Sequence, residues 1–145
     1  MEEVAPIGTI TMLKPLCAAL ILSGMGSAAT GSDASADLRG PWKVTEIEGA
    51  TVPDHAPAEI EFLEDGALAG NAGCNWLMGS YELGAEGRII LRPGGVTMMA
   101  CPEDAMALED RLLGLLPQIT SYAVDKGGAL ILTTDAGRHV RATRR

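Results

Sequence analysis

Short runs of alternating apolar and polar residues, separated by glycine-containing turns, recur along the chain from residue 42 onward. Because successive side chains of a strand point to opposite faces, this period of two predicts half-buried strands. In residues 42–48, Trp42, Val44 and, after one slip in the alternation, Ile47 would face inward. Asp65 and Gly66 form the strongest hairpin signal, since tight primed turns require positive φ values. The pattern favours many short strands over a few long helices.

The remaining strands are assigned on the same pattern. We assign them to residues 59–63, 67–70, 81–83, 88–91, 119–124, 129–134 and 138–141. Pro93-Gly94-Gly95 is interpreted as a break in the sheet, with residues 96–100 as a further candidate strand. Residues 49–57 contain two prolines and an aspartate and are expected to form a loop.

One convincing helix is predicted in this part of the chain, between Pro102 and Pro117. Proline and acidic residues suit a helix start, where backbone amides are unpaired and the dipole is positive. Apolar residues then follow at helical spacing up to Leu116, and Pro117 ends the helix. We therefore expect a mainly β fold with one helix: a small antiparallel β-barrel-like meander of seven to eight strands, with one α-helix packed on or across it.

The charge of the chain argues against nucleic-acid binding. The formal net charge is −8, and the basic residues near the end, Arg138, Arg141, Arg144 and Arg145, are interpreted as a solvated tail. Aromatic residues make up only 3% of the chain, so the core must be largely aliphatic.

Residues 12–29 have the order of a secretory signal peptide: Lys14, an apolar run, then small residues. The run is too short to span a bilayer, and Cys17 lies near its beginning, which does not fit a lipid anchor. We assign residues 1–36 to a signal peptide and linker, with Met12 as a possible true start, and residues 37–145 to the folded domain. The alternative is an N-terminal helix packed on the domain. Export predicts a periplasmic or secreted protein with no stable transmembrane span.

Removal of that segment would leave two of the three cysteines, Cys74 and Cys101. An even pair in an exported domain favours a disulfide, which would stabilise the domain by about 3–4 kcal/mol in the chain-entropy model. Two free buried thiols are the open alternative, because spacing alone does not show that the Cα atoms come within bridging range.

An ordered set of short motifs lies between residues 70 and 109. Residues 70–75 read G-N-A-G-C-N, residues 79–81 read G-S-Y, and residues 97–102 read T-M-M-A-C-P, with Glu109 following in the helix. In this combination and order the chain resembles the META domain family, which includes the HslJ-like heat-shock proteins. The resemblance covers nearly all of residues 37–145 and marks a set of structural motif residues: Gly70, Gly73, Asn75, Gly79, Tyr81, Thr97 and Glu109.

The resemblance implies a mostly antiparallel β-barrel with a helix, often exported or anchored in the bacterial envelope and linked to heat shock and antibiotic tolerance. No enzymatic activity is established for the family, so we expect no catalytic residues, and we expect no cofactor and no metal. We expect a non-catalytic interaction module, a monomer, whose partner is an unknown envelope protein or small ligand. We further expect Asn75 and the glycines to form a bend with positive φ, held by Thr97 and by Glu109 from the helix.

The alternatives to a non-catalytic interaction module are thiol catalysis, zinc binding and the binding of a small ligand or a peptide. A reactive Cys74 would need a base such as His55 or His139, and neither histidine has a diagnostic spacing to it. A zinc site could be supplied by count from Cys74, Cys101, His55 and His139, yet no paired metal-ligand spacing supports one. A barrel lined by Met98, Met99 and the helix could also bind a small ligand or a peptide.

Overall fold

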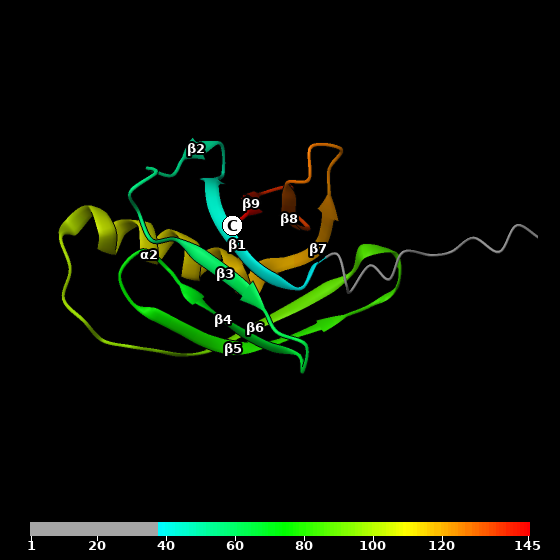
Figure 1. Ribbon diagram of the computed structural model, residues 1–145, viewed down its shortest axis with the longest axis horizontal. Helices are drawn as coiled ribbons and strands as arrows, with labels where there is room; N and C mark the ends of the chain where they lie inside the picture. Colours follow the sequence, from blue (N-terminus) through cyan, green and yellow to red (C-terminus); the bar gives the residue numbers. More distant parts are fainter. Residues whose placement is uncertain (1–37) are drawn as a thin grey trace, which may run out of the picture. The chain divides into compact units, whose positions relative to one another are not determined.

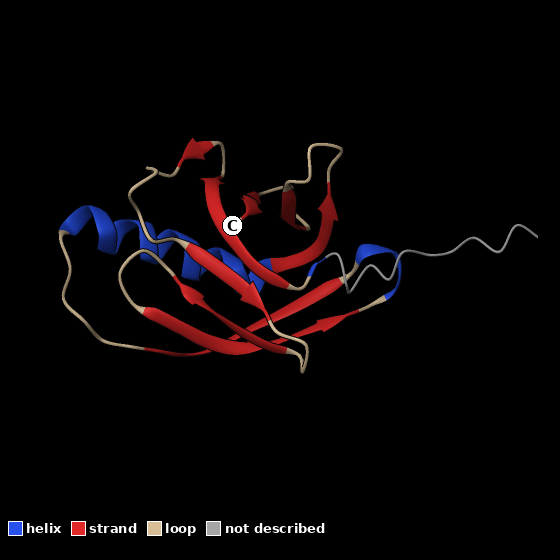
Figure 2. Ribbon diagram, viewed as in Figure 1, coloured by secondary structure: helices blue, strands red, loops and turns tan. Residues whose placement is uncertain are grey.

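The computed structural model describes residues 38–145 (Figures 1 and 2). The strands are β1 (Gly40–Ile47), β2 (Ala50–Thr51), β3 (Glu59–Phe62), β4 (Ala67–Asn71), β5 (Trp76–Leu83), β6 (Ile89–Val96), β7 (Ile119–Val124), β8 (Leu130–Thr134) and β9 (His139–Arg144). The helix α2 spans Glu103–Leu115, and the 3-10 turns η1 (Ala85–Gly87) and η2 (Leu116–Gln118) complete the elements. Within residues 38–145 the fold is mainly β with the single α-helix α2, as the sequence predicted.

All strand pairs are antiparallel, and the sheet runs in the order β6-β5-β4-β3-β1-β9-β8-β7, with the short β2 beside β1. The sheet curls into a half-barrel. Figure 1 shows β3 to β6 as one arm of the curl and β1, β9, β8 and β7 as the other. The two end strands approach each other at one isolated bridge, Arg88 to Ser121. Within residues 38–145 the curl is therefore closed by strand pairing only at this bridge.

The inner face of the curl follows the alternation in the sequence. Trp42, Val44 and Ile47 are all buried, and the register between β1 and β9 shifts between Val44 and Glu46. The slip in the sequence pattern is thus a β-bulge, which adds one residue to β1 and restores the inward direction at Ile47. Across the sheet, one inward row in register consists of Trp42, Ile60, Gly70 and Leu77.

Helix α2 packs against this inner face. Leu112, Leu115 and Leu116 are fully buried and belong to the same core cluster as the inward strand residues. The helix begins directly after Pro102, and Pro117 lies in the 3-10 turn that follows it. It covers apolar surface that an open half-barrel would otherwise expose to water.

Two strand assignments from the sequence are wrong in extent. Strand β5 begins at Trp76, five residues before the predicted start, and β6 continues through Pro93-Gly94-Gly95 to Val96, so no strand occupies residues 97–100. Proline is tolerated here because β6 is an end strand, where a missing N–H leaves no ladder partner unpaired. The register shift between Leu77 and Gly79 takes up the irregularity.

The predicted loop at residues 49–57 contains the two-residue strand β2 and is otherwise irregular. The predicted signal peptide and linker, residues 1–36, the possible start at Met12 and Cys17 all lie outside the described residues.

Candidate functional site

The motif residues meet where the bend after β4 faces helix α2. Asn75 and Glu109 are both buried, with 2% and 5% of their surfaces exposed. The Glu109 carboxylate accepts a hydrogen bond from the Asn75 backbone N–H (2.6 Å to Oε2) and another from the Asn75 side-chain Nδ2 (3.0 Å to Oε1). A buried carboxylate is costly unless it is hydrogen-bonded, and both of its oxygens here have a partner. The helix is thereby tied to the bend.

The opposite side of Asn75 holds the segment that leads into the helix. Its Oδ1 accepts hydrogen bonds from the Met99 N–H (2.6 Å) and from the Thr97 hydroxyl (3.1 Å). Thr97 also accepts at Oγ1 from the Trp76 N–H (3.0 Å), and its own N–H donates to the Trp76 carbonyl (3.0 Å). Asn75 therefore connects three segments: the bend, residues 97–99 and the helix. We call this set, Asn75, Thr97, Met99 and Glu109, the clamp.

A disulfide joins Cys74 to Cys101 beside the clamp, with 6.0 Å between their Cα atoms. It links the bend to the residue directly before Pro102 and the helix. The open alternative of two free thiols is not what the structure contains. Because both sulfurs are bonded to each other, neither is available as a thiolate nucleophile in this state.

The bend itself depends on Gly73. Its φ is +121°, and a Cβ atom there would lie 3.2 Å from the Ala105 carbonyl oxygen and from the Leu108 side chain. Glycine is therefore required both by the backbone angle and by the close approach of the helix. The expectation of a positive φ at Asn75 is wrong, because only Glu48 and Glu86 have positive φ among the described non-glycine residues. The hydrogen bonds of its side chain, rather than its backbone angle, explain the asparagine.

The other predicted motif residues lie within the sheet. A Cβ at Gly70 would lie 2.2 Å from the Glu59 carbonyl oxygen, and one at Gly79 would lie 2.3 Å from that of Arg92, so both allow strands to approach closely. Tyr81 is buried, packs edge-to-face on Phe62 and donates its hydroxyl to the Leu63 carbonyl (2.6 Å). Burial raises the pKa of Tyr81 above its usual value. These three residues position the hairpins and do not form a pocket with the clamp.

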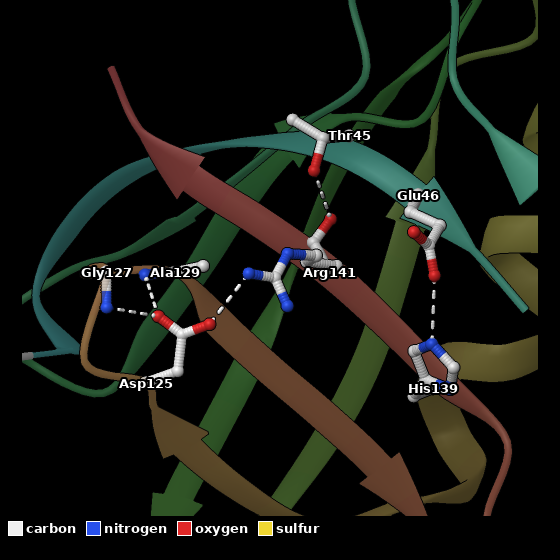
Figure 3. A network of polar contacts seen from close by, with 7 residues as sticks. All are labelled: Thr45, Glu46, Asp125, Gly127, Ala129, His139 and Arg141. Atoms are coloured by element: carbon white, nitrogen blue, oxygen red, sulfur yellow. Dashed lines mark hydrogen bonds and ion pairs between the residues drawn. The ribbon is translucent and has the colours of Figure 1, made fainter. Parts of the chain in front are cut away.

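The two histidines are not part of the clamp or of the disulfide. His55 is in the connection between β2 and β3, and His139 in β9 contacts the Glu46 carboxylate at 3.0 Å. Figure 3 shows His139 on one side of Arg141, whose guanidinium donates to Asp125 at 2.7 Å. The Ala129 backbone N–H, followed by Arg141, holds the pKa of Asp125 below its usual value. In residues 38–145 no group of three or more His, Cys, Asp or Glu side chains could hold a metal ion.

Two surface depressions adjoin helix α2. One, of about 410 Å³, is an apolar slot between the end of β6 and the helix, lined mainly by Val96, Met98, Met99, Met106 and Leu113. The other, of about 560 Å³, lies between the β2–β3 connection and the N-terminal half of the helix. Met98 is 96% exposed at the slot. The clamp residues Asn75 and Glu109 also line the slot, so the clamp fixes its floor.

A third depression, of about 440 Å³, lies on the outer face of the sheet, where no sequence pattern predicted a site. Four adjacent strands each contribute one residue to its lining: Lys43, Glu59, Asn71 and Trp76. Trp76 is 59% exposed, an unusual position for so large an apolar side chain. No local signal marked it, because Trp76, Leu77 and Met78 are all apolar and do not alternate, so the sequence does not show which of them face outward.

Comparisons with known proteins agree on the fold. The family model described as META domain matches residues 36–145. Among curated proteins none matches this chain. A protein from Burkholderia xenovorans, solved by NMR, is 27% identical, with a TM-score of 0.62 over 77% of this chain and 86% of that one. A crystal structure of a DUF4847 family protein from Bacteroides vulgatus, 13% identical, has a TM-score of 0.57 over 74% and 94% of the two chains and supports the fold alone.

Within the described part of the chain, no helix has the length and hydropathy needed to cross a membrane.

Proposed function

Because the chain belongs to the META domain family, we propose that it acts as an exported, non-catalytic interaction domain of the bacterial envelope. The observation that carries this proposal is the disulfide between Cys74 and Cys101. Disulfides persist in oxidising compartments and are rare in the cytosol, so the bond favours export. The order of residues 12–29, typical of a signal peptide, supports the same compartment.

The non-catalytic part of the proposal is supported by how the polar groups are used. The cysteine sulfurs are bonded to each other, and both oxygens of the Glu109 carboxylate accept hydrogen bonds from Asn75. A general acid or base needs a proton-accepting atom within reach of a substrate, and a nucleophile needs a free atom to attack. The Glu109 carboxylate is engaged with Asn75 and the two sulfurs with each other, so we expect these groups to serve the architecture. The association with heat shock and antibiotic tolerance comes from the family resemblance.

The test is an intact mass of the mature protein purified from its native host. We expect a mass that corresponds to cleavage before the domain, about residue 37, minus the two hydrogen atoms lost in one disulfide. Full reduction, in which the reductant supplies two electrons and two protons are taken up, should add two hydrogen atoms and nothing else. A full-length mass with both thiols free would contradict export and the oxidised pair together. The stress association is tested by measuring the abundance of the protein before and after heat shock, with no rise counting against it.

A thiol-reactive probe tests the competing cysteine enzyme. In the native oxidised protein, neither Cys74 nor Cys101 should be labelled without reductant. Labelling of Cys74 far faster than Cys101 would instead indicate an activated thiolate and would revive catalysis.

Binding of a small ligand or peptide is a second candidate, favoured by the apolar slot beside α2. Methionine side chains are flexible and polarizable, and they suit surfaces that adapt to a ligand. Native mass spectrometry of the protein purified from its host should then show a retained adduct, and a clean apo mass would count against it.

A further inference from the structure

The outer face of the sheet carries a polar row that is fixed by strand register. Lys43 pairs with Glu59, Glu59 with Asn71, and Asn71 with Trp76, across β1, β3, β4 and β5. Residues in register on adjacent strands share a face, and the next row along, which contains Trp42 and Leu77, is buried inside. With strands about 4.8 Å apart, the row extends over about 14 Å. That length matches two to three linked sugar rings.

The row forms the floor of the 440 Å³ depression on this face. Residues 54–58 of the β2–β3 connection make one wall, and Trp76 stands at the opposite end. The Lys43 ammonium contacts this wall: it donates to the Asp54 carbonyl (2.9 Å) and lies 3.5 Å from the Asp54 carboxylate. The Val44 N–H also donates to the Ala58 carbonyl (2.9 Å), so the site is built from the sheet and from a loop bonded to it.

The charges in the depression cancel in pairs. Lys43 is paired with Asp54, and the Arg145 guanidinium donates to the Glu59 carboxylate at 2.5 Å. A ligand with a net charge would find no unpaired counter-charge among these four groups. They do offer carboxylate oxygens and N–H donors to a neutral ligand rich in hydroxyl groups.

Asn71 adds a donor that is oriented in advance. Its Oδ1 accepts the Gly73 N–H at 2.9 Å, which fixes the side-chain amide. Asn71 lines the depression, and within residues 38–145 no acceptor takes a hydrogen bond from its Nδ2, so this donor is available to a ligand.

From this geometry we infer that the depression is a binding site for a short neutral oligosaccharide. One ring stacks its C–H face on the Trp76 indole, and the hydroxyl groups of the chain bond to Asn71, Glu59 and Arg145. An aromatic side chain has both the apolar face and the rigidity that such stacking needs. The inference extends the proposed function, since an exported domain is exposed to envelope glycans, but the binding itself can be measured without export.

The number and the exposure of the tryptophans allow one experiment to distinguish the core from the site. There are only two tryptophans: Trp42 is 1% exposed and Trp76 is 59% exposed. Their indole N–H signals in a ¹H–¹⁵N correlation spectrum therefore report the core and the site separately. The probes are chitotriose, with acetamido groups, and cellotriose, with hydroxyl groups alone, titrated to about 10 mM into the oxidised protein.

With at least one trisaccharide, we expect saturable chemical-shift changes of the Trp76 indole N–H signal and of the Asn71 side-chain amide signals. The chemical shift of the Trp42 indole N–H signal should not change. Trp76→Ala should raise Kd about tenfold or more, and Trp76→Tyr should retain most of the affinity. Asn71→Asp should also weaken binding, because it keeps the acceptor for Gly73 but removes the Nδ2 donor. Ile90→Ala, an exposed residue of β6 outside the depression, is the matched control and should bind as the unchanged protein does.

The inference is overturned if neither sugar shifts the Trp76 indole, or if Trp76→Ala binds as tightly as the unchanged protein. Shifts confined to the slot beside α2 would also overturn it and would move the site to Met98 and Met99. Such results would leave the intact-mass test of export and of the disulfide unaffected, so the two proposals can fail separately.

Discussion

Glu109 holds Asn75 by both of its carboxylate oxygens, one on the backbone N–H at 2.6 Å and the other on the side-chain amide at 3.0 Å. The two residues are 34 positions apart in the chain, one in the middle of the helix and the other at the bend before β5. This pair, with the adjacent disulfide, connects α2 to the bend. The contribution of this pair to the free energy of unfolding can be measured.

We expect Glu109→Gln to lower the free energy of unfolding by about 2–3 kcal/mol. The amide has a single acceptor oxygen, so its NH₂ group would face one of the two Asn75 donors and leave that donor unpaired. Urea unfolding of the oxidised protein measures the change. Asp110→Asn, one position along on the exposed side of the same helix, should change the free energy by no more than about 0.5 kcal/mol. Equal effects of the two variants would show that the clamp is not important for stability.

Reduction of the disulfide should lower the free energy of unfolding by about 3–4 kcal/mol, because the 27-residue loop is no longer closed in the unfolded chain. The hydrogen bonds between Asn75 and Glu109 should still hold the bend, so the reduced domain should keep its far-UV circular dichroism at 25 °C. Thermal unfolding with and without reductant checks both parts, with the double variant Cys74→Ser, Cys101→Ser as a reductant-independent comparison. An unchanged midpoint would contradict the prediction.

Gly73→Ala and Gly114→Ala should have opposite effects. At Gly73 the φ of +121° and the 3.2 Å approach to Ala105 make alanine destabilising by about 1–3 kcal/mol. At Gly114, an exposed position of α2 with nothing within 4 Å of the new Cβ, alanine should stabilise by about 0.5–1 kcal/mol through helix propensity. Denaturant titrations of the two variants provide the comparison, and a destabilised Gly114→Ala protein would be evidence against the helix geometry.

Asp125 should make the domain sensitive to acid. Its pKa is lowered by the Ala129 N–H and by Arg141, so below pH 3.8 the unfolded chain binds a proton before the folded one does. The stabilisation is therefore complete above that pH and is lost as the pH falls through the folded-state pKa. Urea unfolding at pH 7 and at pH 3 measures how much free energy of unfolding is lost between the two pH values. This loss should be smaller for Asp125→Asn than for the unchanged protein. An equal loss would assign the acid sensitivity to other carboxylates, with Glu48, paired to Arg138, the first to examine.

Much of the fold could be predicted from local pattern. Alternation placed Trp42, Val44 and Ile47 on one face, and the slip between them marks the bulge in β1. Pro102 and Pro117 bracket the helix because proline lacks the N–H that a helix interior requires. The same rule gave a wrong result at Pro93, because a missing donor is harmless in an end strand and the end position depends on the whole sheet.

The sequence by itself determined the local elements, the position of the bend at Gly73 and the residues able to clamp it, since these depend on backbone angles and on side-chain donors and acceptors. Only the tertiary structure decided that Lys43, Glu59, Asn71 and Trp76 form one row. The reason is register: a shift of one residue between two strands turns every side chain to the other face. Register here depends on core packing and on turns spread over more than thirty residues, which no local pattern specifies.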